Sequence, residues 1–196
     1  KGTKRHVFLI GLLFGLSQFV VDQLFGPNLL PGSPASLLYY VVTGVLSGVA
    51  VLAYATAGLL VVAGEKLSFA RAFSEMSRLP AALVVTVPLS VLCMYMYATL
   101  GVGWWMGLGL LLLPMTFWPL YLVDRELDPL SAIARSYGLV FENLGESLLY
   151  ALWSAALGAL VGLTLGIAII WVLPFLIIVP AAMFSMAEGI EGAYNP

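Results

Sequence analysis

The sequence predicts an all-α fold: a polytopic integral membrane bundle of six transmembrane helices, with two amphipathic helices in the cytoplasmic interface. Its 196 residues are 62% hydrophobic and 9% charged, with a mean hydropathy of +1.04, whereas a soluble domain carries about 25% charged residues. All eight Lys and Arg residues lie in three stretches, 1–5, 66–78 and 125–135. The apolar gap after each stretch has room for two helical crossings, so all the positive charge can lie on one side of a bilayer.

The individual spans follow from the lengths of the apolar runs, since about 20 apolar residues cross a bilayer as a helix. An uncharged Pro/Gly/Ser loop at 26–36 separates the first two spans, and a glycine turn at 101–103 separates the third and fourth. The final apolar stretch, 147–187, would form a helix of about 60 Å, twice the hydrocarbon thickness, so we expect two spans there. Within one domain, 1–196, the expected spans are 7–25, 37–63, 80–100, 104–123, 147–165 and 167–187.

The expected topology places both termini on the basic side of the membrane. An even number of crossings returns the chain to its starting side, and the basic side is cytoplasmic by the positive-inside rule. Aromatic residues favour the membrane interface. Those near the predicted outer ends are Tyr39, Tyr40, Tyr95, Tyr97, Trp104, Trp105 and Trp171.

Two amphipathic helices are expected in the charged returns, over 68–79 and 129–142. Apolar residues in each return follow the i, i+3, i+4, i+7 spacing of one helix face, with polar residues mostly opposite. We expect the apolar side chains to contact membrane lipids and the cations to contact phosphate headgroups, at about 1 kcal/mol for each cation. The residues assigned to this surface are Lys66, Phe69, Arg71, Phe73, Arg78, Leu130, Arg135 and Tyr137.

The two returns also look like copies of one unit. Glu65 and Glu126 each precede a predicted helix cap, Ser68 in the first return and Asp128 in the second. Asp128 is followed by Pro129, which suits the first helical position because that residue needs no N–H donor. The sequence therefore predicts an internal repeat of span, interfacial helix and span, an arrangement that occurs in some transporters.

Three segments are similar to a known membrane family. They are AGEKLSF at 63–69, LLLLPMTFWPLYLVDRE at 110–126, and DPLSA at 128–132 leading to Ser136, Leu139 and Asn143. These segments resemble a six-span membrane-domain family, found alone or fused ahead of the catalytic domain of some bacterial glycerophosphodiester phosphodiesterases. The resemblance implies a six-span helical domain in the cytoplasmic membrane of a bacterium or archaeon. It implies no catalytic residue here, because the phosphodiesterase site of the fused proteins belongs to a separate soluble domain.

Asp22 is a carboxylate beside the first span and outside the charged returns, and Gln18 lies one helical turn before it on the same face. An intramembrane carboxylate is costly, which favours a functional proton or cation site. The alternative is an interfacial residue that is solvated or bonded to a neighbour, and the depth of Asp22 near the outer headgroups favours this interpretation. Gln18 and Asp22 together form a candidate intramembrane polar site.

Several glycines recur at a spacing of four residues within the expected spans. Small residues at this spacing let helix backbones approach closely. We expect these glycines to pack the six spans together, and the alternative is a docking seam for another membrane subunit. They are Gly11 and Gly15, Gly44 and Gly48, and Gly158, Gly162 and Gly166.

The residue types argue against catalysis and against nucleic-acid binding. The chain has one Cys and one His, with no Ser/His/Asp set, no metal-ligand spacing and no Gly-rich phosphate loop, so it lacks the usual bases, nucleophiles and metal sites. Its net charge of −2 gives no electrostatic reason to bind nucleic acid. We therefore expect a protein that is not an enzyme and that has no metal and no cofactor.

The function favoured by the sequence is that of a membrane scaffold or an accessory subunit of a larger membrane assembly. Its expected partners are membrane lipids and other membrane subunits. One alternative is a transporter of a small solute or lipid, with a pathway between the two pseudo-repeats and Asp22 as a coupling group. Its kinks would come from span prolines such as Pro88, Pro114, Pro119 and Pro174. A second alternative, a regulatory membrane anchor, follows only from the fused architectures of the similar family.

Overall fold

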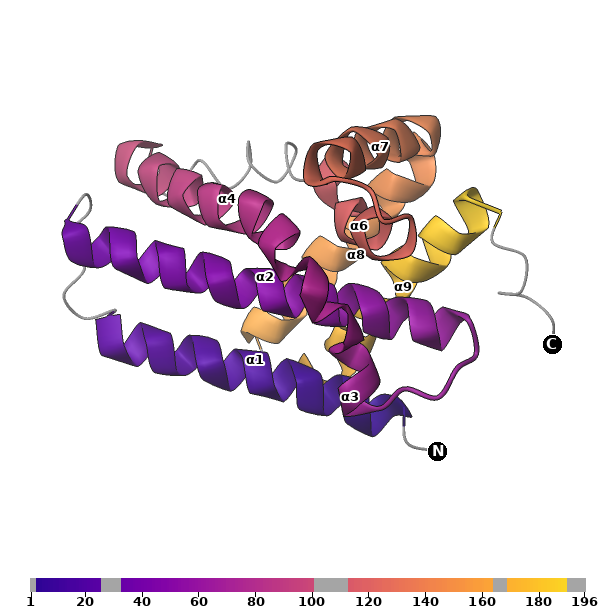
Figure 1. Ribbon diagram of the computed structural model, residues 1–196, viewed down its shortest axis with the longest axis horizontal. Helices are drawn as coiled ribbons and strands as arrows, with labels where there is room; N and C mark the ends of the chain where they lie inside the picture. Colours follow the sequence, from indigo (N-terminus) through magenta and orange to yellow (C-terminus); the bar gives the residue numbers. More distant parts are fainter. Residues whose placement is uncertain (1–2, 26–32, 101–112, 164–168, 190–196) are drawn as a thin grey trace.

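The computed structural model describes residues 3–25, 33–100, 113–163 and 169–189, and every regular element in these ranges is a helix (Figure 1). The all-α prediction is therefore confirmed for this part of the chain. The elements are α1 (Thr3–Phe25), α2 (Pro34–Val62), α3 (Phe69–Ala72), η2 (Ser74–Arg78), α4 (Leu79–Leu100), η4 (Leu113–Met115), α6 (Trp118–Asp124), α7 (Pro129–Glu142), α8 (Leu144–Leu163) and α9 (Ile169–Ala187).

Several of these helices have the length and composition of membrane spans. Four helical segments of the described residues are long and apolar enough to cross a bilayer: Arg5–Phe25 in α1, Pro34–Val62 in α2, Phe69–Cys93 from α3 through η2 into α4, and Leu144–Val161 in α8. Val172–Ala187 is a shorter apolar helix. These helices are consistent with the membrane location that the composition predicts.

The first, second, third, fifth and sixth expected spans correspond to α1, α2, α4, α8 and α9, with bounds that differ by a few residues. The sequence accounts for both ends of α2. At its start, the backbone N–H of Ser36 donates to Ser33 Oγ at 3.2 Å, and Pro34 occupies the first turn. At its end, Gly64 takes a left-handed conformation with φ of +73°, which glycine adopts without steric cost.

The fourth expected span, 104–123, differs from the prediction of one continuous helix. Residues 101–112 lie outside the described part of the chain, and the remainder consists of η4 and α6 with a break at Thr116 and Phe117. Pro114 and Pro119 explain the break, because each lacks an N–H donor and its ring excludes a regular preceding turn. The six-span count depends partly on residues that the structure does not describe.

The first charged return also differs from the single amphipathic helix predicted over 68–79. It forms the short helix α3, capped by Ser68, and then η2, which contains a non-helical residue at Glu75 (φ −89°, ψ 18°). The kink divides the apolar residues of this return between two core clusters. Ala72 and Phe73 pack with α1 and the end of α2, whereas Met76 and Leu79 pack with α6 and α7. A straight helix would present all of them to one side.

The second charged return forms one helix with the predicted bounds, α7, over Pro129–Glu142. Asp128 caps it as expected, because the backbone N–H of Ser131 donates to Asp128 Oδ2 at 3.1 Å. The two returns therefore have different lengths and helix types. The internal repeat stays a prediction.

Helix α2 is the centre of the bundle, because it packs against α1, α4, α6 and α9 (Figure 1). The C-terminal half of α2 contains many small buried residues, which let several helices pack close to its axis. They are Ala53, Ala55, Thr56, Ala57 and Gly58. Around this helix the start of α1, α3, α7 and the end of α9 lie towards the same end of the molecule in Figure 1, on its right. We call this the charged end.

Candidate functional site

Ion pairs join the two charged returns to each other and to the end of α9. Arg78 Nη2, from the first return, lies 2.9 Å from Glu126 Oε1 in the second. Arg125 Nη2 lies 3.5 Å from Glu188 Oε2, at the end of α9, and the Tyr121 hydroxyl donates to the same carboxylate. Three segments far apart in the sequence therefore meet at the charged end.

Two of the four cations assigned to headgroup contact are bonded to carboxylates within the protein. Arg71 pairs with Glu65, and Arg78 pairs with Glu126 and also with Glu75 at 3.5 Å. The side chains of Lys66 and Arg135 are exposed and form no ion pair within the described residues. Lys66 and Arg135 are therefore the cations best placed for phosphate headgroups.

The aromatic residues of the first return have different surroundings. Phe69 is exposed, whereas Phe73 is half-buried, with its ring centroid 6.1 Å from that of Phe14 in α1. Phe14 in turn contacts the Tyr54 ring edge-to-face at 5.6 Å. Phe73 therefore anchors the return to the bundle, and Phe69 is the one available to lipid.

Helix α7 presents three distinct faces. Of the residues predicted to contact lipid, Leu130 is 74% exposed, and Tyr137 is half-buried beside Phe141, which is 64% exposed. A polar strip with Arg135 and Glu142 runs next to them. A third face is packed inside the protein, and its buried residues are Ala132, Ser136, Leu139 and Val140. This division suits a helix at the meeting line of protein, lipid and water.

Ser136 has a structural role that the spacing pattern did not reveal. Its side chain is fully buried, accepts from the backbone N–H of Phe117 at 3.0 Å, and donates to the Pro114 carbonyl at 2.5 Å. The hydroxyl thereby satisfies two backbone groups left open by the break between η4 and α6. The sequence signal for this role was a Ser at a position on the otherwise apolar face of the helix, with Ala132, Leu139 and Val140.

Asp22 is held by two donors from different helices. Gln18 Nε2 and the Tyr39 hydroxyl of α2 both donate to Asp22 Oδ1, at 2.8 Å and 2.7 Å. The structure thus brings together the two predicted residues of the polar site. Sequence reasoning missed Tyr39 as a member, because it was assigned only to the aromatic interface. The cluster ties α1 to α2 near the ends remote from the charged end (Figure 1).

The glycines divide into contact positions and open positions. A Cβ on Gly44 would lie 2.7 Å from Val87 Cα, and one on Gly48 would lie 2.9 Å from Leu83 Cδ2, both in α4. Gly11 is covered by the Leu173 side chain of α9. These three glycines lie in contacts between helices, as small residues in membrane bundles do.

Other glycines have different surroundings. Gly15 and Gly158 have no atom within 4 Å of the position that a Cβ would take. Gly162 is within α8, but its surroundings are outside the described set, as is Gly166 altogether. Gly58 was missed, and its Cβ would lie 2.7 Å from the Ile177 carbonyl oxygen of α9. The sequence signal for a close helix contact at Gly58 was the small residues just before it, Ala55 and Ala57.

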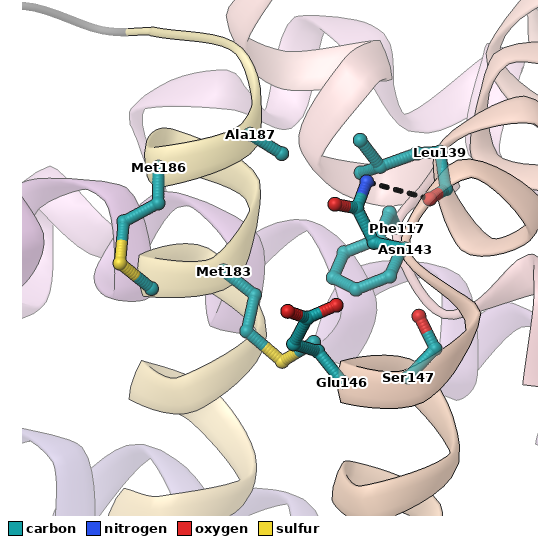
Figure 2. Close-up of a pocket in the computed structure, with 8 residues that line it drawn as sticks. All are labelled: Phe117, Leu139, Asn143, Glu146, Ser147, Met183, Met186 and Ala187. Atoms are coloured by element: carbon teal, nitrogen blue, oxygen red, sulfur yellow. Dashed lines mark hydrogen bonds between the residues drawn. The ribbon is translucent and has the colours of Figure 1, made fainter.

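A cavity of about 220 Å³ lies at the charged end, between the end of α7, the start of α8 and the end of α9 (Figure 2). Its polar lining comes from Asn143, Glu146 and Ser147, which the sequence analysis did not assign to a site. Apolar walls complete it, formed by Phe117, Leu139, Met183 and Met186. Among the described residues, no group of three or more His, Cys, Asp or Glu side chains is arranged to hold a metal ion.

Comparisons with protein-family models, with curated proteins and with solved structures found no match.

Proposed function

We propose that this chain is a non-catalytic integral membrane protein that serves as a scaffold or accessory subunit of a larger membrane assembly. In this proposal it crosses the cytoplasmic membrane of a bacterium or archaeon six times, with both termini in the cytoplasm. The convergence of the two basic returns and the end of α9 at the charged end supports an even number of crossings.

The observation that carries the proposal is the position of α8. Its main contacts are with α7 and α9. Only 6% of its most apolar 18-residue segment is buried inside the protein, against 39% of the corresponding segment of α2. In a bilayer, an apolar helix face is as well accommodated by lipid as by another helix, so hydrophobicity does not drive helix association. Packing between the helices drives it. Of the four candidate spans in the described part of the chain, α8 thus has the most surface left for a partner.

The chemistry of this surface suits close helix packing. Ala155, Gly158 and Ala159 are exposed, and the space beside Gly158 is open. Small residues at this spacing let a second backbone approach. Large apolar side chains flank them, and those exposed are Leu148, Leu149, Leu152, Trp153, Leu160 and Leu163.

The experiment is affinity purification of the full chain in mild detergent, followed by mass spectrometry of the copurified proteins. We expect a defined membrane partner at fixed stoichiometry, and loss of that partner with Gly158→Leu. Gly15→Leu is the matched control, because Gly15 is equally open but lies on α1. A chain that purifies alone, or a partner lost equally with both variants, contradicts the proposal.

A second candidate function is transport, and one observation favours it. A cavity of about 220 Å³ lies between α2, α6, α8 and α9, with Pro119 and Pro180 in its lining beside Tyr54 and Tyr150. Span prolines and polar groups beside a cavity inside the bundle are features of transporter pathways. Solute flux in proteoliposomes, abolished by Asp22→Asn, is the result expected of a transporter. The regulatory-anchor alternative rests on the family resemblance alone.

A further inference from the structure

The cavity between α7, α8 and α9 presents hydrogen-bond acceptors to its interior. Asn143 Nδ2 donates to the Leu139 carbonyl at 3.0 Å, so the amide oxygen is the group that faces away from α7 (Figure 2). The Glu146 carboxylate extends from α8 towards α9 (Figure 2). Ser147 Oγ also lines the space, is buried in a residue that is 1% exposed, and has no hydrogen-bond partner. A buried hydroxyl without a partner is costly, so an occupant that bonds it is favoured.

The charges around the cavity favour a cation. Helices α7 and α9 both end beside it, and neither has a basic residue in its last turn. The negative ends of these two helix dipoles therefore outnumber the one positive end, the start of α8. Glu146 adds a formal negative charge. Arg125, the cation of the neighbouring return, is already paired with Asp124 and Glu188.

The lining distinguishes between classes of cation. A divalent metal ion prefers six or more oxygen ligands with several carboxylates, whereas this cavity supplies one carboxylate, one amide oxygen and one hydroxyl. The volume of about 220 Å³ is several times the roughly 30 Å³ that a water molecule occupies in the liquid. The side chains of Phe117 and Met183 form an apolar wall that suits methylene groups.

We propose that this cavity binds the primary ammonium group of a small alkylamine. Three N–H donors of the ammonium group match the oxygens of Asn143, Glu146 and Ser147, and the carbon chain packs on Phe117 and Met183. The amine has two sources at the charged end of a membrane protein: the ethanolamine headgroup of a phospholipid and a free amine in solution. The site is at the start of α8, about two turns before the small residues Ala155, Gly158 and Ala159, so its occupancy and the copurification of a partner are measured with different variants.

The test uses the purified full chain in nanodiscs of phosphatidylcholine, with thermal unfolding as the readout. Free ethanolamine is titrated in one arm, phosphatidylethanolamine replaces part of the lipid in a second, and choline is titrated in a third. We expect ethanolamine or its phospholipid to raise the melting temperature, and choline, which has no N–H donor, to have no such effect. A response to the phospholipid alone identifies the headgroup as the source, and a response to free ethanolamine identifies a soluble amine.

Variants separate binding from structure. Glu146→Gln should weaken ethanolamine binding by up to about tenfold, because the Gln amide oxygen still accepts a hydrogen bond but carries no charge to pair with the ammonium group. Ser147→Ala should weaken binding while leaving the unliganded protein as stable as the wild type, because its hydroxyl has no partner to lose. Glu142→Gln is the control, since it removes the same charge from the exposed polar face of α7. Equal responses to ethanolamine and choline, or equal losses for Glu142→Gln and Glu146→Gln, would overturn the proposal.

Discussion

Replacing Gly44 by Ala tests the packing of the two helices at the heart of this fold. The added Cβ would lie 2.7 Å from Val87 Cα and 3.1 Å from the Thr86 carbonyl oxygen, both backbone atoms of α4. Carbon atoms are comfortable at about 3.5–4.0 Å, so α2 and α4 must separate by about 1 Å. A flexible side chain could move aside, but two helical backbones cannot yield independently.

The size of the effect follows from two opposing terms. Overpacking of this kind costs about 1–3 kcal/mol, while Ala in place of Gly favours a helix by about 1 kcal/mol. We expect a net loss of up to about 2 kcal/mol in the free energy of unfolding for Gly44→Ala. Gly158→Ala meets no atom within 4 Å and should be neutral or stabilising by up to about 1 kcal/mol.

The assay is equilibrium unfolding in mixed detergent micelles, followed by tryptophan fluorescence and helical circular dichroism. The two variants make the same chemical change in helices of similar composition, so the helix-propensity term cancels in their comparison. If Gly44→Ala unfolds at the same denaturant concentration as Gly158→Ala, the close approach of α2 and α4 is refuted.

Further predictions concern the charged end and the polar cluster. Ser136→Ala should cost about 1–3 kcal/mol of stability, because the Phe117 N–H loses its buried acceptor, and chemical denaturation that shows no loss would contradict this role. Glu126→Gln should cost under about 1 kcal/mol of stability, since the Arg78 and Glu126 side chains are 23% and 75% exposed. A double-mutant cycle measures the coupling energy of this ion pair, and a coupling above about 1 kcal/mol would contradict the prediction. Hydrogen bonds from Ser131 lower the pKa of Asp128 below its ordinary value. The cap therefore contributes its full stability above about pH 4 and loses it as the pH falls further, so Asp128→Asn should flatten the acid limb of the stability curve. Asp22→Asn should leave the Tyr39 hydrogen bond in place but weaken it, and an unchanged melting temperature with both Asp22→Asn and Asp22→Ala would show that the cluster does not join α1 to α2.

Much of the fold could be predicted from the sequence, because hydropathy and charge are properties that add along the chain. The long apolar runs correspond to α1, α2, α4, α8 and α9, since a helix of that length satisfies its own backbone wherever it lies. The Asp128 cap and the bounds of α7 also follow from local chemistry, which needs no distant partner. The kink at Glu75 could not be predicted, since two separate core clusters compete for the apolar residues of the first return.

The candidate sites were less accessible to sequence reasoning. Gln18 and Asp22 could be paired because they lie one turn apart, but Tyr39 joins them from another helix. Gly44 and Gly48, which share the four-residue spacing, lie close to α4, but the same spacing at Gly158 meets open space. The pattern within one helix describes a shape that permits close packing, and only a neighbouring helix decides whether that packing occurs.

The sequence alone determined that this is an apolar, helical chain with its positive charge in three clusters, because burial in lipid and helix formation depend on residues close together in the chain. Tertiary structure decided which cations find carboxylates, which face of α7 is buried, and which three helix ends enclose the cavity of Asn143, Glu146 and Ser147. Those outcomes depend on distances between residues far apart in sequence, and such distances are set by packing of whole helices and not by any local pattern.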